Sequence, residues 1–103
     1  MKPSDIPSKM HRGYLRWQVF ERDSYTCVLC SRAAVDVHHV VPRSQGGSNL
    51  PDNLVSVCRL HHILLHGQHV IGLDEDTADA KYRALEYVCD YYADKWRGYS
   101  HLD

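Results

Sequence analysis

The chain has 103 residues, of which 44% are apolar and 24% charged; this fits one globular domain and excludes disorder as the default. No apolar run approaches the roughly 20 residues of a transmembrane helix, and the N-terminal residues lack the apolar stretch of a signal peptide. We therefore expect a cytoplasmic protein with no membrane partner. Structural disulfides are rare in that compartment. The four cysteines and eight histidines are many for so short a chain and suggest a metal site.

Charge divides unevenly along the sequence, although the net charge is only −1 with neutral histidines. Residues 1–66 carry eight Lys and Arg against five Asp and Glu, whereas residues 67–103 carry four against eight. The first segment, at +3, can face a polyanion, particularly with a divalent ion bound to it, and the second segment, at −4, cannot easily do so. The alternative interpretation is that both are solvated surfaces.

The N-terminal part of the chain predicts one helix. Residues 1–10 are expected to be flexible, and residues 11–103 to form a single domain. Within residues 11–22, Leu15 and Val19 are four positions apart and define an apolar helix face.

The middle of the chain predicts two strands and a short helix. Residues 35–41 are rich in β-branched side chains and predict a strand that stops at Pro42. A long loop over residues 42–53 then leads to a second short strand over residues 54–57. Residues 59–66 predict a helix, which the following glycine ends.

A long helix is predicted over about residues 77–97. Asp76 or Thr77 can cap its N-terminus, and Gly98 suits the position after its end. We interpret the helix as a packing element, and Cys89 as a small buried hydrophobe rather than a metal ligand. The spacing of three and four residues predicts an apolar seam of Tyr82, Leu85, Cys89, Tyr92 and Trp96.

Two pairs of metal-ligating residues share the same spacing. Cys27 and Cys30 are separated by two residues, as are Cys58 and His61. Two such pairs supply the four ligands of a tetrahedral zinc site. The alternatives are free buried thiols, or a disulfide between Cys27 and Cys30 that the expected compartment disfavours.

Four further histidines are not explained by the zinc site. His62 and His66 lie four positions apart, so they share one helix face and can hold one divalent ion. His38 and His39 end the first predicted strand, where neighbouring side chains point to opposite faces. One of these two can therefore be a ligand while the other has a different role.

Three sequence segments resemble the HNH endonuclease family over about residues 16–67. The segments, in order, are Arg-Asp-Ser-Tyr-Thr-Cys-Val-Leu-Cys, His-His-Val-Val-Pro-Arg-Ser-Gln-Gly-Gly and Asp-Asn-Leu-Val-Ser-Val-Cys-Arg-Leu-His-His, followed by His66. The resemblance implies an α+β fold with a small ββα-metal core held by a zinc site. An N-terminal helix and a long C-terminal helix would flank this core.

The resemblance also implies residue roles. His39 would be the general base that takes a proton from the attacking water, and Asn53 would brace the loop and help to orient that base. The catalytic ion would be bound by His38, His62 and His66, with His62 as the last letter of the motif. The general chemistry agrees, because a metal ion can stabilise charge that develops on a phosphate while an imidazole removes the proton.

The family's structural zinc ligands match Cys27, Cys30 and Cys58, with His61 at a position that is often cysteine. Three cysteines and one histidine remain a good zinc set. For the second ion, a shell of imidazoles favours Mn²⁺, Ni²⁺, Co²⁺ or Zn²⁺, and Mg²⁺ can still act when phosphate and water fill the shell.

The sequence thus predicts a metal-dependent DNA endonuclease that hydrolyses phosphodiester bonds. The expected partner is double-stranded DNA, bound with little sequence specificity. Arg43 and Arg59 are candidate phosphate contacts or plain surface residues. One alternative is a non-catalytic, zinc-stapled nucleic-acid-binding module, and another is an interaction domain that acts through its acidic C-terminal helix. The family's occurrence in phage packaging, restriction and mobile elements implies a bacterial or phage-encoded setting.

Overall fold

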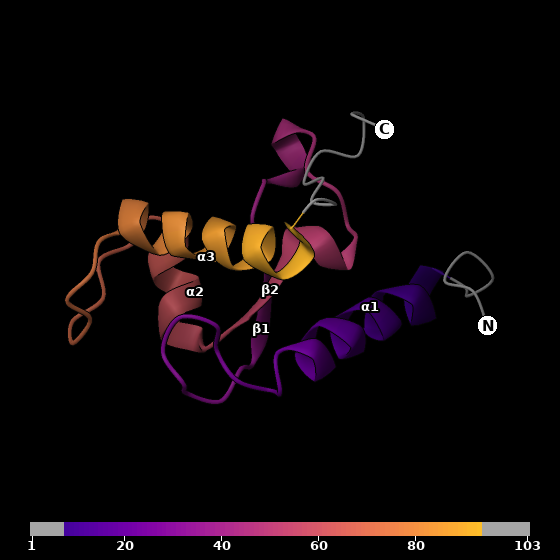
Figure 1. The fold of residues 1–103 in the computed structure, drawn as a ribbon. Coiled ribbons are helices and arrows are strands. Elements are labelled where there is room, and N and C mark those ends of the chain that lie inside the picture. Colours follow the sequence, from indigo (N-terminus) through magenta and orange to yellow (C-terminus); the bar gives the residue numbers. More distant parts are fainter. Residues whose placement is uncertain (1–7, 94–103) are drawn as a thin grey trace.

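The computed structural model describes residues 8–93 as helices arranged around a small sheet (Figure 1). Of the expected flexible segment 1–10, residues 1–7 lie outside the described part, and Ser8 already begins the first helix. The elements in chain order are α1 (Ser8–Arg22), β1 (Asp36–His39), η2 (Arg43–Gln45), η3 (Pro51–Asn53), β2 (Leu54–Val57), α2 (Arg59–Leu65) and α3 (Thr77–Tyr92).

Strands β1 and β2 pair antiparallel, with Asp36 opposite Val57 and His39 opposite Leu54. The second strand has the predicted bounds, whereas the first is shorter than the predicted 35–41. All four residues of β2 are buried, because α1 and α3 both pack on this strand. The predicted α+β fold with a ββα core, an N-terminal helix and a C-terminal helix is confirmed.

Helix α3 packs on α2 and β2, but not through the predicted seam. Its buried residues are Ala80, Ala84 and Val88, which lie four positions apart, while Tyr82 is 64% exposed. Small alanines allow the helix to approach its neighbours closely, and tyrosine can keep its hydroxyl in water. The seam prediction was wrong for Tyr82, and the buried stripe is offset around the helix from the predicted seam.

The remaining seam residues have mixed positions. Leu85 and Cys89 are half-buried, and Tyr92 packs against the edge of the core. The helix ends at Tyr92 rather than at residue 97, and the predicted seam member Trp96 and the predicted C-cap Gly98 lie outside the described residues. Asp76 caps the N-terminus as predicted, since its carboxylate accepts a hydrogen bond from the backbone N–H of Asp79 at 2.8 Å.

Arg22 and Asp23, at the end of α1, join several elements. The Arg22 guanidinium forms two hydrogen bonds with the Asp23 carboxylate, at 2.7 and 2.8 Å. The same carboxylate accepts hydrogen bonds from the Tyr87 hydroxyl of α3 at 2.6 Å and from the Ser56 N–H of β2 at 3.0 Å. Helices α1 and α3 are thereby fixed to the central strand by a buried polar network.

Asn53 closes the loop between the strands. Its side chain, which is fully buried, accepts a hydrogen bond from Val41 N–H at 2.8 Å and donates to the carbonyls of Val41 at 3.0 Å and Ser48 at 2.9 Å. Gly47 lies inside this closed loop, where a Cβ atom would come within 1.8 Å of the Val41 carbonyl oxygen. The loop conformation therefore requires both the amide of Asn53 and the absence of a side chain at position 47.

Within the part of the chain that the structure describes, no helix is both long and apolar enough to cross a membrane.

The close approach at Gly47 makes the loop sensitive to a single methyl group. We expect Gly47→Ala to lower the free energy of unfolding by about 1–3 kcal/mol, because the loop backbone must shift to accept the Cβ atom. Urea unfolding measures the change. Gly13→Ala is the matched control, since a Cβ added there in helix α1 meets nothing within 4 Å apart from its chain neighbours and its own helix backbone. We expect this substitution to raise the free energy of unfolding by about 0.5–1 kcal/mol. Equal effects of the two substitutions would contradict the steric argument.

Candidate metal centres and active site

The four predicted zinc ligands come together in the structure. The ligand atoms of Cys27, Cys30, Cys58 and His61 all lie within 4.8 Å of one another. The Sγ atoms of Cys30 and Cys58 are 3.6 Å apart, and His61 Nδ1 is 3.5 Å from Cys58 Sγ. Zinc–sulfur bonds of about 2.3 Å in a tetrahedron place sulfur atoms about 3.8 Å apart. The donor set and its spacing therefore fit one zinc ion.

The described cysteines, including Cys89, are all free, so no disulfide joins Cys27 to Cys30. Burial opposes the ionisation of Cys30, but hydrogen bonds from the backbone and side chain of Arg32 outweigh it and lower the pKa of this thiol to about 6. A thiolate is the form that binds zinc. Cys89 is half-buried and lies outside this cluster.

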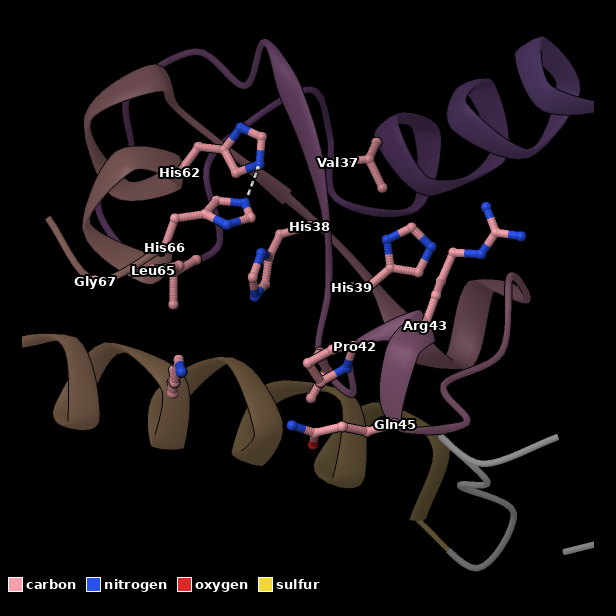
Figure 2. A pocket seen from close by; sticks show the side chains of 12 residues that line it. Val37, His38, His39, Pro42, Arg43, Gln45, His62, Leu65, His66 and Gly67 are labelled. Atoms are coloured by element: carbon pink, nitrogen blue, oxygen red, sulfur yellow. Dashed lines mark hydrogen bonds between the residues drawn. The ribbon is translucent and has the colours of Figure 1, made fainter. Parts of the chain in front are cut away.

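Three other histidines form a second cluster. His38 on β1 meets His62 and His66 on and just after α2, and their ligand nitrogens lie within 4.8 Å of one another (Figure 2). The Nε2 atoms of His62 and His66 are 3.1 Å apart. Burial, and then the neighbouring imidazoles of His66 and His62, lower the pKa of His38 to about 4. His38 therefore keeps a lone pair near neutral pH, as a metal ligand must.

Asp36 supports this cluster and was missed by the sequence analysis. Its Oδ2 atom lies 3.0 Å from His62 Nδ1 and 3.2 Å from the Nε atom of Arg59. The contact directs the other imidazole nitrogen of His62 toward the cluster, which is how carboxylates commonly orient metal-binding histidines. A signal was present in the sequence, because residues two apart on a strand share a face, and Asp36 is two residues before His38.

His39 lies on the opposite face of β1 from His38, as the strand alternation predicts (Figure 2). Its Nε2 atom donates a hydrogen bond to Asn49 Oδ1 at 2.7 Å, which leaves the lone pair on Nδ1. Asn53, which the resemblance expected to brace the loop and to help orient the base, makes its side-chain hydrogen bonds to the loop backbone. The contact to His39 comes from Asn49, a loop residue that no spacing in the sequence identifies.

A cavity of about 630 Å³ connects these groups. Its lining includes the three clustered histidines and His39, together with Arg43 from η2 and Lys81 from α3, and none of its lining residues is acidic. A second cavity, of about 250 Å³, adjoins it and shares Val37, His39 and Arg43 with it. Arg16 of α1 and Asn49 also line the second cavity. Arg59 is 68% exposed at its side chain and lines neither cavity.

Residues 27–68 match the family model described as HNH endonuclease. The match agrees with the family that the sequence motifs resemble. The matched segment contains both candidate metal-binding clusters, His39 and Asn53, whereas α1 and α3 lie outside it. HNH domains usually act as nucleases on DNA and bind divalent metal, so the match supports a function related to nucleic acid and nuclease activity. No curated protein gives a significant match to the chain.

One cysteine inside the candidate zinc cluster, Cys58, and one outside it, Cys89, give a direct test of the cluster. We expect Cys58→Ser to lose bound zinc and the cooperative thermal transition, because structural zinc contributes roughly 10 kcal/mol or more in small peptide sites. Cys89→Ser removes a half-buried thiol outside the cluster and should keep both properties. Elemental analysis and circular dichroism report the two quantities. A zinc-free Cys58→Ser variant that melts like the wild type would contradict the assignment.

Proposed function

We propose that the protein is a metal-dependent DNA endonuclease that hydrolyses phosphodiester bonds. The observation that carries this proposal is a single cavity that joins three clustered imidazoles to His39, with no carboxylate in its lining. A divalent ion in such a site supplies stabilisation of the charge that develops on the phosphate and on the leaving oxygen. A module that only binds nucleic acid has no need of this arrangement.

In the proposed site, His38, His62 and His66 hold the divalent ion. All three ligands are imidazole nitrogens, which suit Mn²⁺, Co²⁺, Ni²⁺ or Zn²⁺ better than Mg²⁺. Asp36 orients His62 from outside the cluster, and Arg59 contacts the same carboxylate oxygen.

His39 is the proposed general base. Its Nδ1 atom accepts a proton from the attacking water, while Asn49 holds the Nε2 proton at 2.7 Å and so keeps the ring in the required tautomer. Asn53 contributes less directly, because it fixes the loop from which Asn49 reaches the ring. Strand β1 thus positions the His39 ring, and Asn49 from the loop fixes its tautomer.

The cations around the cavity suggest how the substrate lies. Lys81 and Arg43 line the large cavity, and Arg16 and Arg43 line the adjoining one. We propose that one DNA strand crosses both cavities, so that its phosphates meet these cations and the scissile bond lies beside His39. The contacts are to the backbone, so binding should show little sequence specificity and should weaken with salt. Residues 11–103 would then act as one nuclease unit, since Arg16 and Lys81 lie outside the matched segment.

Plasmid nicking tests the proposed activity. Protein stripped with chelator should be inactive and should recover with divalent ions from the panel Mn²⁺, Co²⁺, Ni²⁺, Zn²⁺ and Mg²⁺. We expect His39→Ala to lose about 10²- to 10⁴-fold in rate while it still binds DNA and metal, because a general base acts on the transition state. His69→Ala is the control, as His69 is exposed and lines neither cavity. A His39→Ala variant with most of the wild-type rate would refute the role of this residue.

Lys81 tests whether α3 contributes to substrate binding. We expect Lys81→Gln to weaken DNA binding several-fold and to reduce the slope of log K against log salt by roughly 1, as for the loss of one phosphate contact. Glu86→Gln is the control, because Glu86 is an exposed charge on the same helix outside both cavities. If only the net charge of the helix mattered, Glu86→Gln would strengthen binding about as much as Lys81→Gln weakens it, and fluorescence anisotropy distinguishes the two outcomes.

A further inference from the structure

The outer nitrogen of His61 faces a carboxylate from a distant part of the chain. His61 Nδ1 points to the cysteine cluster, and His61 Nε2 lies 2.8 Å from Oε1 of Glu75. The His61 side chain is only 3% exposed, and that of Glu75 is 20% exposed. Glu75 lies just before α3 and outside the HNH segment 27–68. The Nε2 atom of His61, a buried ligand of the proposed zinc, thus contacts Glu75, which lies outside the matched segment.

Glu75 is itself held in place by Arg83 of α3. The Nη1 atom of Arg83 lies 2.6 Å from Oε2 of Glu75, and its Nη2 atom donates to the carbonyl of Leu29 at 2.7 Å. Leu29 lies between Cys27 and Cys30. The contacts therefore run from the histidine ligand through Glu75 and Arg83, and they return to the segment that carries two cysteine ligands.

We propose that Glu75, fixed by Arg83, positions His61 to bind the structural zinc through Nδ1, so that the segment just before α3 is part of the metal site. An imidazole ligand has two nitrogens, and a carboxylate on the outer one fixes the tautomer, orients the ring and raises its strength as a donor. A thiolate has no outer nitrogen to be fixed. Glu75 would therefore matter because the fourth ligand is histidine, and it should have no such role beside a fourth cysteine.

A double-mutant cycle separates this role from that of an ordinary ion pair. The four full-length proteins are the wild type, Glu75→Gln, His61→Cys and the double variant, and zinc affinity is measured by competition with a chromogenic chelator. We expect Glu75→Gln to weaken zinc binding 10- to 100-fold when His61 is present and to change it by less than about threefold in the His61→Cys background. Glu86→Gln, an exposed glutamate on α3, is the control and should have no effect in either background.

Two results would overturn the proposal. If Glu75→Gln weakens zinc binding equally in both backgrounds, Glu75 only holds α3 against the core. If Glu75→Gln does not change zinc binding with His61 present, the contact between Glu75 and His61 has no role in binding. If His61→Cys does not fold, imidazole NMR of the zinc-loaded wild type decides the question. A protonated Nε2 with zinc on Nδ1, whose Nε2 proton exchanges faster in Glu75→Gln, supports the proposal. Zinc on Nε2, or an exchange rate that Glu75→Gln leaves unchanged, contradicts it.

Discussion

The buried pair of Arg22 and Asp23 is the interaction on which the arrangement of the elements depends. A sheet of two four-residue strands cannot by itself fix the helices on either side of it. The pair supplies directional contacts where the hydrophobic core is small: Arg22 donates to the carbonyls of Pro51 and Leu54 at 2.8 and 2.7 Å, and Asp23 receives Tyr87 from α3. Because Pro51 begins η3, the same pair anchors the end of the loop between the strands that Asn53 closes.

The sequence predicted which residues form the two candidate metal-binding clusters better than it predicted their surroundings. Ligand spacing follows from local geometry: a separation of three positions brings Cys27 close to Cys30, and a separation of four positions places His62 and His66 on one helix face. The partners of these residues depend on how distant segments return in the fold. Glu75 lies 14 positions from His61 in the sequence, and Asn49 lies ten positions from His39. Neither separation matches a helix or strand repeat, so the sequence pattern does not reveal these contacts.

The error in helix α3 has a related cause. An apolar pattern identifies a stripe of large side chains, and tyrosine counts as large and apolar although its hydroxyl favours water. The face that α3 buries is instead built on Ala80, Ala84 and Val88, whose small size permits close packing against α2 and β2. Tyr87, which the seam omitted, is partly buried because its hydroxyl reaches Asp23. Polar contacts and the close approach of the helices, as well as hydrophobicity, thus determine which side chains of α3 are buried.

Helix α2 carries residues of both candidate metal-binding clusters. His61 and His62 are adjacent on a helix, where neighbouring side chains point about 100° apart, so they reach different clusters. A helix of seven residues is marginal by itself and must be held by its ends and its packing. Cys58 is its N-cap and accepts a hydrogen bond from the His61 N–H at 3.4 Å. Any ion bound by Cys58 and His61 therefore fixes the first turn of α2, and with it the position from which His62 and His66 face His38.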